Sequence, residues 1–223
     1  IQGKAKVNHN IEIEQKTNYP WDGKIDVTVN PEKSGKFSIL FRIPGWAQDS
    51  PVPTNLYTFA DAPQPYVMKV NGHQLLNLSS EMQKGYVVVN RKWKHGDRVE
   101  ITLPMSVRRV KANDNVEDDR GKLALERGPV MYCLEGIDQK DSMVFNKVIT
   151  ETAPIKAQYV ANKLNGIVEL SGQAEELEKD GAVKDVPFRA IPYSTWDNRC
   201  SGQMEVWVPS PPAHAHFAPE PTY

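Results

Sequence analysis

A repeated alternation of apolar and polar residues constrains this chain more than any other feature of its sequence. The alternation recurs in four segments: residues 11–14, 25–29, 37–43 and 99–103. Because successive side chains of a β-strand point to opposite faces, each segment is predicted to be a strand with one buried face and one wet face. Two further runs, residues 86–89 and 130–134, are apolar throughout, as in strands that are buried on both sides.

Turn-forming residues separate these predicted strands. Asn71-Gly72 is typical of a two-residue hairpin, since a type I′ turn needs a positive φ at both central residues. We interpret residues 30–35 and 94–97 as further hairpin connections. The one helix-like segment, residues 174–179, is short and almost wholly polar, so we expect loop or edge strand there. The pattern predicts an all-β fold of two consecutive antiparallel β-sandwich (jelly-roll-like) domains.

A polar stretch at residues 112–120 indicates a domain boundary, because it is nearly free of core residues and has predicted strands on both sides. On this basis the first domain covers residues 1–116 and the second covers 117–210. Residues 211–223 form a proline-rich segment that is expected to be an extended tail. Its two histidines, at 214 and 216, are too few ligands for a zinc site.

The charge balance and hydropathy exclude two classes of partner. The 27 Lys and Arg residues are matched by 28 Asp and Glu residues, so no concentrated basic surface for nucleic acid is expected. The chain contains no apolar run of the roughly 18 residues that a membrane span needs. It begins Ile1-Gln2-Gly3-Lys4, without Met or an apolar signal segment, so we expect a piece of a larger protein.

The two cysteines, Cys133 and Cys200, are too few for a disulfide scaffold. They form either one bridge or two separate thiols. Cys133 lies in the apolar run at residues 130–134, which favours a thiol packed in the core, because Cys packs as a small hydrophobic residue.

The sequence offers few candidates for catalysis. A retaining glycosidase needs two carboxyl groups about 5–5.5 Å apart, and Asp118, Asp119 and Glu126 are the residues considered. Neighbours in an extended strand point to opposite faces, and the Asp pair lies in a charged linker, which favours a solvated, salt-bridged segment. No Gly-x-Ser-x-Gly turn or phosphate-binding loop is present. We assign no catalytic residue.

Aromatic residues provide the candidate binding sites. In residues 193–199 the aromatic Trp196 is followed by Asp197, Asn198 and Arg199, a combination that suits either sugar binding or domain docking. Two other tryptophans stand beside turn residues and are docking candidates: Trp21 and Trp46. For every tryptophan, including Trp93 and Trp207, packing in a core or between domains is the competing interpretation.

An ordered set of motifs goes beyond a generic β protein. Before residue 117 the motifs are Thr17-Asn18-Tyr19-Pro20-Trp21-Asp22-Gly23, Phe41-Arg42-Ile43-Pro44-Gly45-Trp46, Val70-Asn71-Gly72, Arg91-Lys92-Trp93-Lys94 and Leu103-Pro104-Met105. After it come Asp119-Arg120-Gly121-Lys122, Arg127-Gly128-Pro129-Val130, Ala190-Ile191-Pro192-Tyr193, Trp196 and Asn198-Arg199. This series resembles the C-terminal region of the β-L-arabinofuranosidase-like enzymes of glycoside hydrolase family 127.

The resemblance implies that this chain has a catalytic domain as its partner and that the catalytic residues belong to that domain. Such enzymes carry an (α/α)6-barrel catalytic domain before these sandwiches. Their catalysis is attributed to two residues of that barrel, a zinc-held cysteine nucleophile and a glutamate. No residue of this chain matches that set, so no metal ligand or cofactor is expected here, although the parent enzyme would hold zinc. The resemblance also implies a periplasmic or extracellular location.

Three hypotheses follow. In the first, the chain is a structural, non-catalytic pair of sandwiches that supports the barrel of an enzyme acting on plant-type arabinose-containing glycans. In the second, it is an autonomous carbohydrate-binding module with an exposed aromatic platform. In the third, it is an independent hydrolase, which would require a pocket with converging acidic groups.

Overall fold

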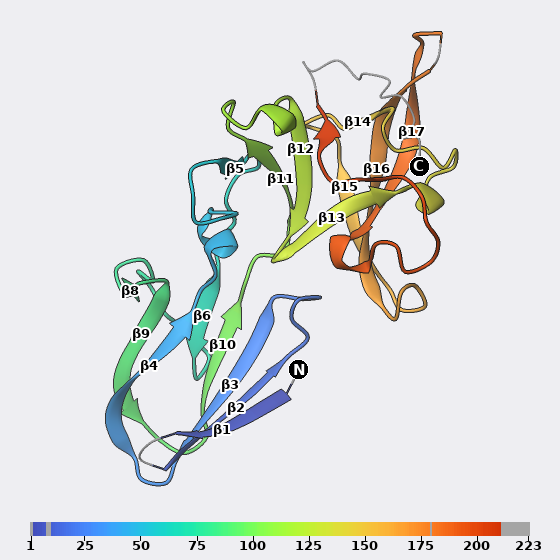
Figure 1. The fold of residues 1–223 in the computed structure, drawn as a ribbon. Coiled ribbons are helices and arrows are strands. Elements are labelled where there is room, and N and C mark those ends of the chain that lie inside the picture. Colours follow the sequence, from blue (N-terminus) through green and yellow to red (C-terminus); the bar gives the residue numbers. More distant parts are fainter. Residues whose placement is uncertain (1, 8–9, 179, 211–223) are drawn as a thin grey trace. The chain divides into compact units, whose positions relative to one another are not determined.

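The structure is a computed structural model, and it describes residues 2–7, 10–178 and 180–210. The chain divides into two compact units (Figure 1). The first unit comprises residues 1–50 and 63–105, and the second comprises residues 51–62 and 106–223. The chain therefore leaves the first unit at residue 51, contributes a short segment to the second unit, and returns.

The first unit is a sandwich of two antiparallel sheets that differ in width. The larger sheet has, in order, β1 (Gln2–Val7), β2 (Ile11–Thr17), β3 (Lys24–Pro31), β10 (Asp97–Thr102), β6 (Val67–Val70) and β7 (His73–Gln74). The smaller sheet has β4 (Gly35–Arg42), β9 (Tyr86–Trp93) and β8 (Met82–Gln83). A short 3-10 turn, η1 (Gly45–Gln48), follows β4.

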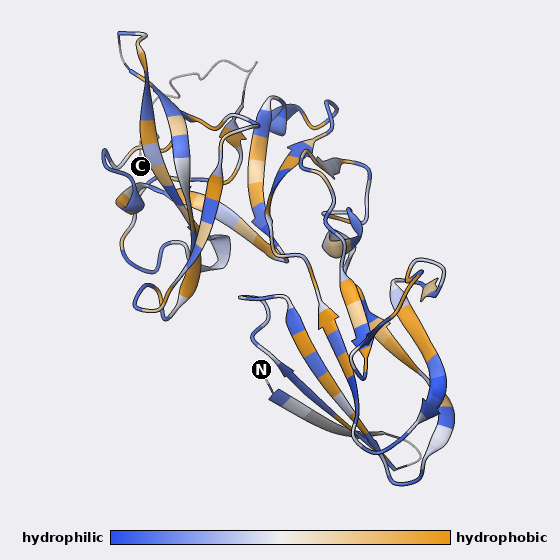
Figure 2. Cartoon of the chain, turned by 180° about the vertical axis from the view of Figure 1, so that it is seen from behind, coloured by the Kyte–Doolittle hydropathy of each residue, from blue (hydrophilic) through white to orange (hydrophobic). Residues whose placement is uncertain are grey.

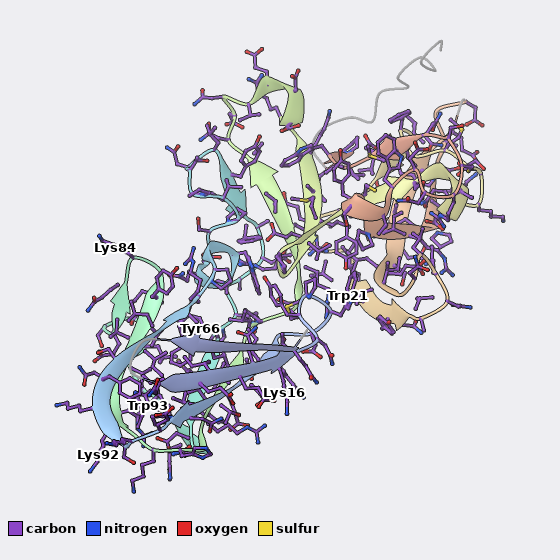
Figure 3. The ribbon with its side chains drawn as sticks, turned by 60° about the horizontal axis from the view of Figure 1, so that its bottom comes forward. Lys16, Trp21, Tyr66, Lys84, Lys92 and Trp93 are labelled. Atoms are coloured by element: carbon purple, nitrogen blue, oxygen red, sulfur yellow. The ribbon has the colours of Figure 1, made fainter. Side chains whose placement is uncertain are left out.

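The core of the first unit lies between these sheets and explains the alternation in the sequence. Val27 of β3 pairs with Val99 of β10, and both are buried on the same face. Trp93 is fully buried, its indole N–H donates to the Phe37 carbonyl at 3.0 Å, and its ring stacks on that of Phe37 (Figure 3). The neighbouring Lys92 is exposed. Hydrophobic and hydrophilic residues alternate along the strands of this unit (Figure 2).

The second unit is built on one ten-stranded sheet. The main order is β14 (Lys147–Val148), β16 (Ile167–Leu177), β17 (Val183–Pro192), β13 (Val130–Glu135), β12 (Lys122–Arg127), β11 (Val107–Ala112) and β5 (Tyr57–Phe59). Three more strands pair with β16, β13 and β12 respectively: β15 (Ile155–Val160), β18 (Met204–Glu205) and β19 (Val208–Pro209). The remaining elements are the 3-10 turns η2 (Glu117–Asp119), η3 (Gly136–Asp138) and η4 (Tyr193–Thr195).

Most of the predicted elements are confirmed. The six apolar or alternating segments coincide with β2, β3, β4, β9, β10 and β13. Asn71 and Gly72 have φ angles of 50° and 79° and connect β6 to β7 as a tight hairpin. The predicted all-β fold with antiparallel sandwich domains is therefore confirmed.

Two predicted hairpins are wrong. Residues 30–35 connect β3 to β4, and residues 94–97 connect β9 to β10, so both turns carry the chain from one sheet to the other. The two crossings support each other, because the Gly96 N–H donates to the side chain of Asn30 at 3.0 Å. The side chain of Asp97 accepts from the Lys94 N–H at 2.9 Å. Turn chemistry was identified correctly, but it does not specify which sheet receives the next strand.

Residues 174–177 form the end of β16 and are neither loop nor edge strand. They pair with β17 on one side and, at residues 175–176, with β14 on the other. Their polar side chains are accommodated by charge, since Glu176 pairs with the fully buried Lys147 at 3.0 Å and with Lys184 at 3.0 Å. Residue 179, the last of the predicted segment, lies outside the described residues.

The division between the units differs from the sequence-based boundary at residue 116. Residues 107–112 form β11, which pairs with β12 along five residues, so the polar stretch after it is a connection inside the second unit. Asp61 fastens the inserted segment that carries β5, because it accepts from the Arg109 N–H at 2.5 Å and from its guanidinium at 2.7 Å. The predicted tail, with His214 and His216, lies outside the described residues.

Both cysteines are free thiols. Cys133 is buried, as predicted for a core thiol, whereas Cys200 is exposed. Of the helices that the structure describes, none is long and apolar enough to cross a membrane.

Candidate functional site

The loop after β17 in the second unit carries four of the candidate residues. Thr195 closes η4 by donating its hydroxyl to the Pro192 carbonyl at 2.7 Å, and the Trp196 N–H donates to the Tyr193 carbonyl at 3.1 Å. Asp197 then takes a positive φ of 60°, which reverses the chain. Asn198 donates its side-chain amide to the Trp196 carbonyl at 3.2 Å. These local bonds give the loop a defined shape.

Two aromatic rings of this loop are exposed and parallel. The rings of Tyr193 and Trp196 have centroids 6.3 Å apart and planes that differ by 10°. Tyr193 is 47% exposed and Trp196 is 36% exposed, so part of each ring faces solvent. Parallel aromatic rings with accessible faces can stack on the apolar face of a sugar or on an apolar partner surface.

Arg199 anchors the loop to the sheet. Its guanidinium donates two hydrogen bonds to the Asp138 carboxylate, at 2.8 and 2.6 Å, and a further bond to the Glu135 carboxylate. Glu135 is 1% exposed, and its other oxygen accepts from the Asp197 N–H at 3.2 Å. Bidentate arginine–carboxylate pairs have fixed geometry. The charged group of Arg199 is therefore held inside the domain.

The ion pairs extend from Asp138 to the neighbouring strands. Lys163 donates to Asp138 at 2.6 Å and also bonds Glu169 of β16. Arg189 of β17 pairs with Glu169 at 2.6 Å, with its side chain more than half exposed. Three acidic and three basic side chains thus form one network, which we call the Arg199 cluster: Glu135, Asp138, Lys163, Glu169, Arg189 and Arg199.

The electrostatics of the Arg199 cluster favour its charged forms. Burial by itself would raise the pKa of Asp138, but hydrogen bonds from Arg199 and Lys163 hold that pKa below its ordinary value. The carboxylates of Asp138 and Glu135 raise the pKa of Arg199. Burial, together with the nearby carboxylates of Glu135 and Asp138, raises the pKa of Cys133 to about 12. This thiol is therefore uncharged at neutral pH and a poor nucleophile.

The other two candidate tryptophans belong to the first unit. Trp46 is half-buried, packs against the core of that unit and lies beside the hydroxyl of Tyr19. Trp21 is also half-buried, and its backbone N–H donates to the Asn18 carbonyl at 2.9 Å (Figure 3). Only Trp196, Asp197, Asn198 and Arg199 are therefore brought together in one loop.

Sequence reasoning found the loop but missed the residues that hold it. Glu135, Asp138, Lys163 and Glu169 come from three separate segments, and no local pattern marks them as partners of Arg199. The only available signal was Glu135, which directly follows the apolar run at residues 130–134. A charge that is buried with such a run needs a partner.

The acidic residues considered for catalysis occupy different settings within the second unit. Glu126 of β12 is 7% exposed, and burial raises its pKa to about 7, offset in part by Arg108. Asp118 is exposed on η2, whereas Asp119 is half-buried and its carboxylate lies 3.5 Å from the Tyr57 hydroxyl. Burial also raises the pKa of Asp119. A raised pKa alone does not make a site, because acid–base chemistry needs a second group at a defined distance.

The family resemblance also raises the question of a metal site in this chain. Within residues 2–7, 10–178 and 180–210, no three His, Cys, Asp or Glu side chains are grouped so that they could hold a metal ion. The zinc that the family resemblance implies for a parent enzyme therefore has no ligand set among these residues.

Comparison with known families assigns both units. Residues 1–105 match the middle domain of the family 127 β-L-arabinofuranosidases, and residues 107–209 match the glycoside hydrolase family 127 C-terminal domain. The chain therefore belongs to glycoside hydrolase family 127 and contains its middle and C-terminal domains.

Individual relatives agree with this assignment. The chain is 32% identical to a non-reducing end β-L-arabinofuranosidase of Bifidobacterium longum, over 93% of this chain and 32% of that protein. A solved family 127 β-arabinofuranosidase is 36% identical, with a TM-score of 0.86 over 94% of this chain and 33% of its own. A β-L-arabinofuranosidase from Geobacillus stearothermophilus T6 is 33% identical, with a TM-score of 0.82 over 94% of this chain and 32% of its own. The chain spans about a third of the length of these relatives.

Proposed function

We propose that this chain is the structural, non-catalytic part of an exported family 127 β-L-arabinofuranosidase that acts on arabinose-containing plant glycans. Its partner is the catalytic barrel of the same protein. The observation that carries the proposal is the match of both units to the middle and C-terminal domains of a family whose compared members are about three times as long. The acidic and thiol groups of the second unit agree with it, since Cys133 is buried and uncharged and the Arg199 cluster is internally paired.

The proposal is tested by turnover. Full-length protein and residues 1–223 are assayed side by side on a chromogenic β-L-arabinofuranoside, with and without added zinc. We expect turnover from the full-length protein and none above background from residues 1–223. Turnover by residues 1–223 alone would refute the structural role. Inactivity of both proteins would show that the proposed substrate class is wrong.

Carbohydrate binding is the second candidate, and one observation favours it. The rings of Tyr193 and Trp196 are parallel, exposed and held by a loop with defined geometry. On this hypothesis an exposed ring of the stacked pair receives the apolar face of an arabinose-containing oligosaccharide.

Calorimetry separates the two candidates. Arabinose-containing oligosaccharides are titrated into the wild-type chain and into the variants Trp196→Ala and Tyr159→Ala. Tyr159 is 55% exposed in the same unit, so it controls for the loss of an unrelated surface aromatic. Saturable heat that is lost only in Trp196→Ala supports binding. Absence of heat in all three supports the structural role.

A further inference from the structure

The smaller sheet of the first unit has an open edge. Among the residues that the structure describes, β4 pairs only with β9, so it is the last strand of its sheet. The opposing sheet is six strands wide, whereas this sheet has three (Figure 1). The sandwich is thus unequal, and part of the larger sheet has no strand opposite it.

The pairing of β4 with β9 determines which backbone groups of β4 point to its open side. Ile43 donates its N–H to the Gly85 carbonyl at 3.0 Å, and the next pair along the ladder is Arg42 with Tyr86. In an antiparallel pair, bonded and non-bonded residues alternate. The N–H and C=O groups of Ser38 and Leu40 therefore point away from β9. An unpaired row of this kind is a template for another strand.

An apolar groove runs beside this edge. Its volume is about 440 Å³, and β4 contributes one wall through Ile39 and Phe41. The larger sheet contributes the other wall through Ile13, Ile25, Val27 and Ile101, together with Leu103, which directly follows β10. Leu40, at the rim, is 53% exposed. The groove lies entirely inside the first unit.

The edge carries little of the usual protection against strand pairing. Natural sheets protect exposed edges with proline, bulges or charged side chains. The ladder between β4 and β9 is regular over eight pairs without a bulge, and β4 contains no proline. Charged side chains stand only near its ends, at Lys36 and Arg42, which leaves the segment around Ser38 and Leu40 open.

We propose that an extended strand from the remainder of the full-length protein, outside residues 1–223, adds to the edge of β4 and completes the sandwich. Alternate apolar side chains of this strand fill the groove, and its backbone pairs with Ser38 and Leu40. The proposal rests on the proposed function in one respect, namely that these domains work inside a longer family 127 enzyme. About two thirds of the length of the relatives lies outside the matched part, which supplies the donor.

A donor on the same polypeptide is favoured over a second copy of the chain. A strand on the same polypeptide binds intramolecularly, and a short linker that spans the two sites gives it an effective concentration on the order of millimolar, which exceeds the concentration of a second molecule in dilute solution. The recognition chemistry is that of β-strand addition, in which main-chain hydrogen bonds give affinity and alternate side chains enter a groove.

The experiment measures amide hydrogen exchange in the full-length protein at single-residue resolution. The amides of Ser38 and Leu40 report on the added strand, and those of Ile39 and Phe41, which point toward β9, are internal controls. We expect Ser38 and Leu40 to exchange on the order of 100-fold or more slowly than unprotected amides, similar to the controls. A photo-reactive benzophenone amino acid in place of Leu40 then identifies the donor after irradiation.

The expected cross-link joins Leu40 to a segment of the same polypeptide outside residues 1–223. Unprotected Ser38 and Leu40 amides, a cross-link to a second copy, a cross-link confined to residues 1–223, or no cross-link would each overturn the proposal. Ser38→Pro gives an independent readout, because it removes an outward N–H but keeps the pairing with β9. It should lower the melting temperature of the full-length protein more than the control Ser38→Ala. Turnover by the same preparation tests the proposed function separately.

Discussion

Replacing Arg199 with methionine tests whether the Arg199 cluster holds the loop of residues 193–199. The substitution keeps an unbranched side chain but removes the guanidinium that bonds Glu135 and Asp138. Asp138 keeps its bond from Lys163. Glu135, which is 1% exposed, keeps only the bond from the Asp197 N–H among those described for its carboxylate. The main cost is therefore a buried carboxylate that has lost its counter-charge.

The magnitude follows from this geometry. Removal of one partner of a buried ion pair typically costs about 3–5 kcal/mol. The Arg199 side chain is 22% exposed, so water can reach part of the vacated site, and we expect the lower end, about 3 kcal/mol. With an m-value of about 1–3 kcal/mol/M in urea, a loss of about 3 kcal/mol should lower the unfolding midpoint of the second unit by about 1 M or more.

Urea denaturation followed by tryptophan fluorescence and circular dichroism measures this change. Lys111→Met is the matched control in the same unit, because its ion pair with Glu151 is exposed on both sides (41% and 42%) and its loss should barely move the midpoint. Adding Glu135→Gln to Arg199→Met should recover part of the loss by removing the stranded charge. Equal midpoints of the second unit in Arg199→Met and Lys111→Met would refute the reasoning, as would a double variant that is less stable than Arg199→Met.

Three further predictions concern other parts of the fold. Trp93→Ala should destabilise the first unit by about 3–5 kcal/mol in the same denaturation assay, whereas Trp93→Phe should cost less because most of the buried ring volume is kept. Burial raises the pKa of Glu205 to about 8, and its Oε2 has no hydrogen-bond partner among the described residues. The folded state therefore keeps this proton while the unfolded chain loses it near pH 4.5, so stability should fall as pH rises from about 4.5 to 8. Glu205→Gln should reduce that slope and add on the order of 2 kcal/mol at pH 8; an unchanged slope would contradict the assignment. Finally, a thiol reagent should modify Cys200 alone in the native protein and Cys133 only after unfolding, since burial and nearby carboxylates raise the pKa of Cys133 to about 12; rapid modification of both would contradict this.

The sequence alone determined where six of the strands lie and, where apolar and polar residues alternate, which of their faces is buried. Alternation in residues 25–29 and 99–103 identified β3 and β10, and Asn71-Gly72 identified the hairpin between β6 and β7. These features are local, because the two faces of a strand and the φ angles of a tight turn are set within a few residues. The burial of Cys133 followed from the same kind of local pattern.

The tertiary structure alone decided which sheet each strand joins and which charges pair. The turns at residues 30–35 and 94–97 change sheets, and β5 is inserted into the second unit from within the sequence of the first. Arg199 meets Glu135 and Asp138 although 64 and 61 positions separate them in the sequence. The physical reason is that strand partners and buried ion pairs are selected by long-range packing and desolvation, which no short window of sequence records.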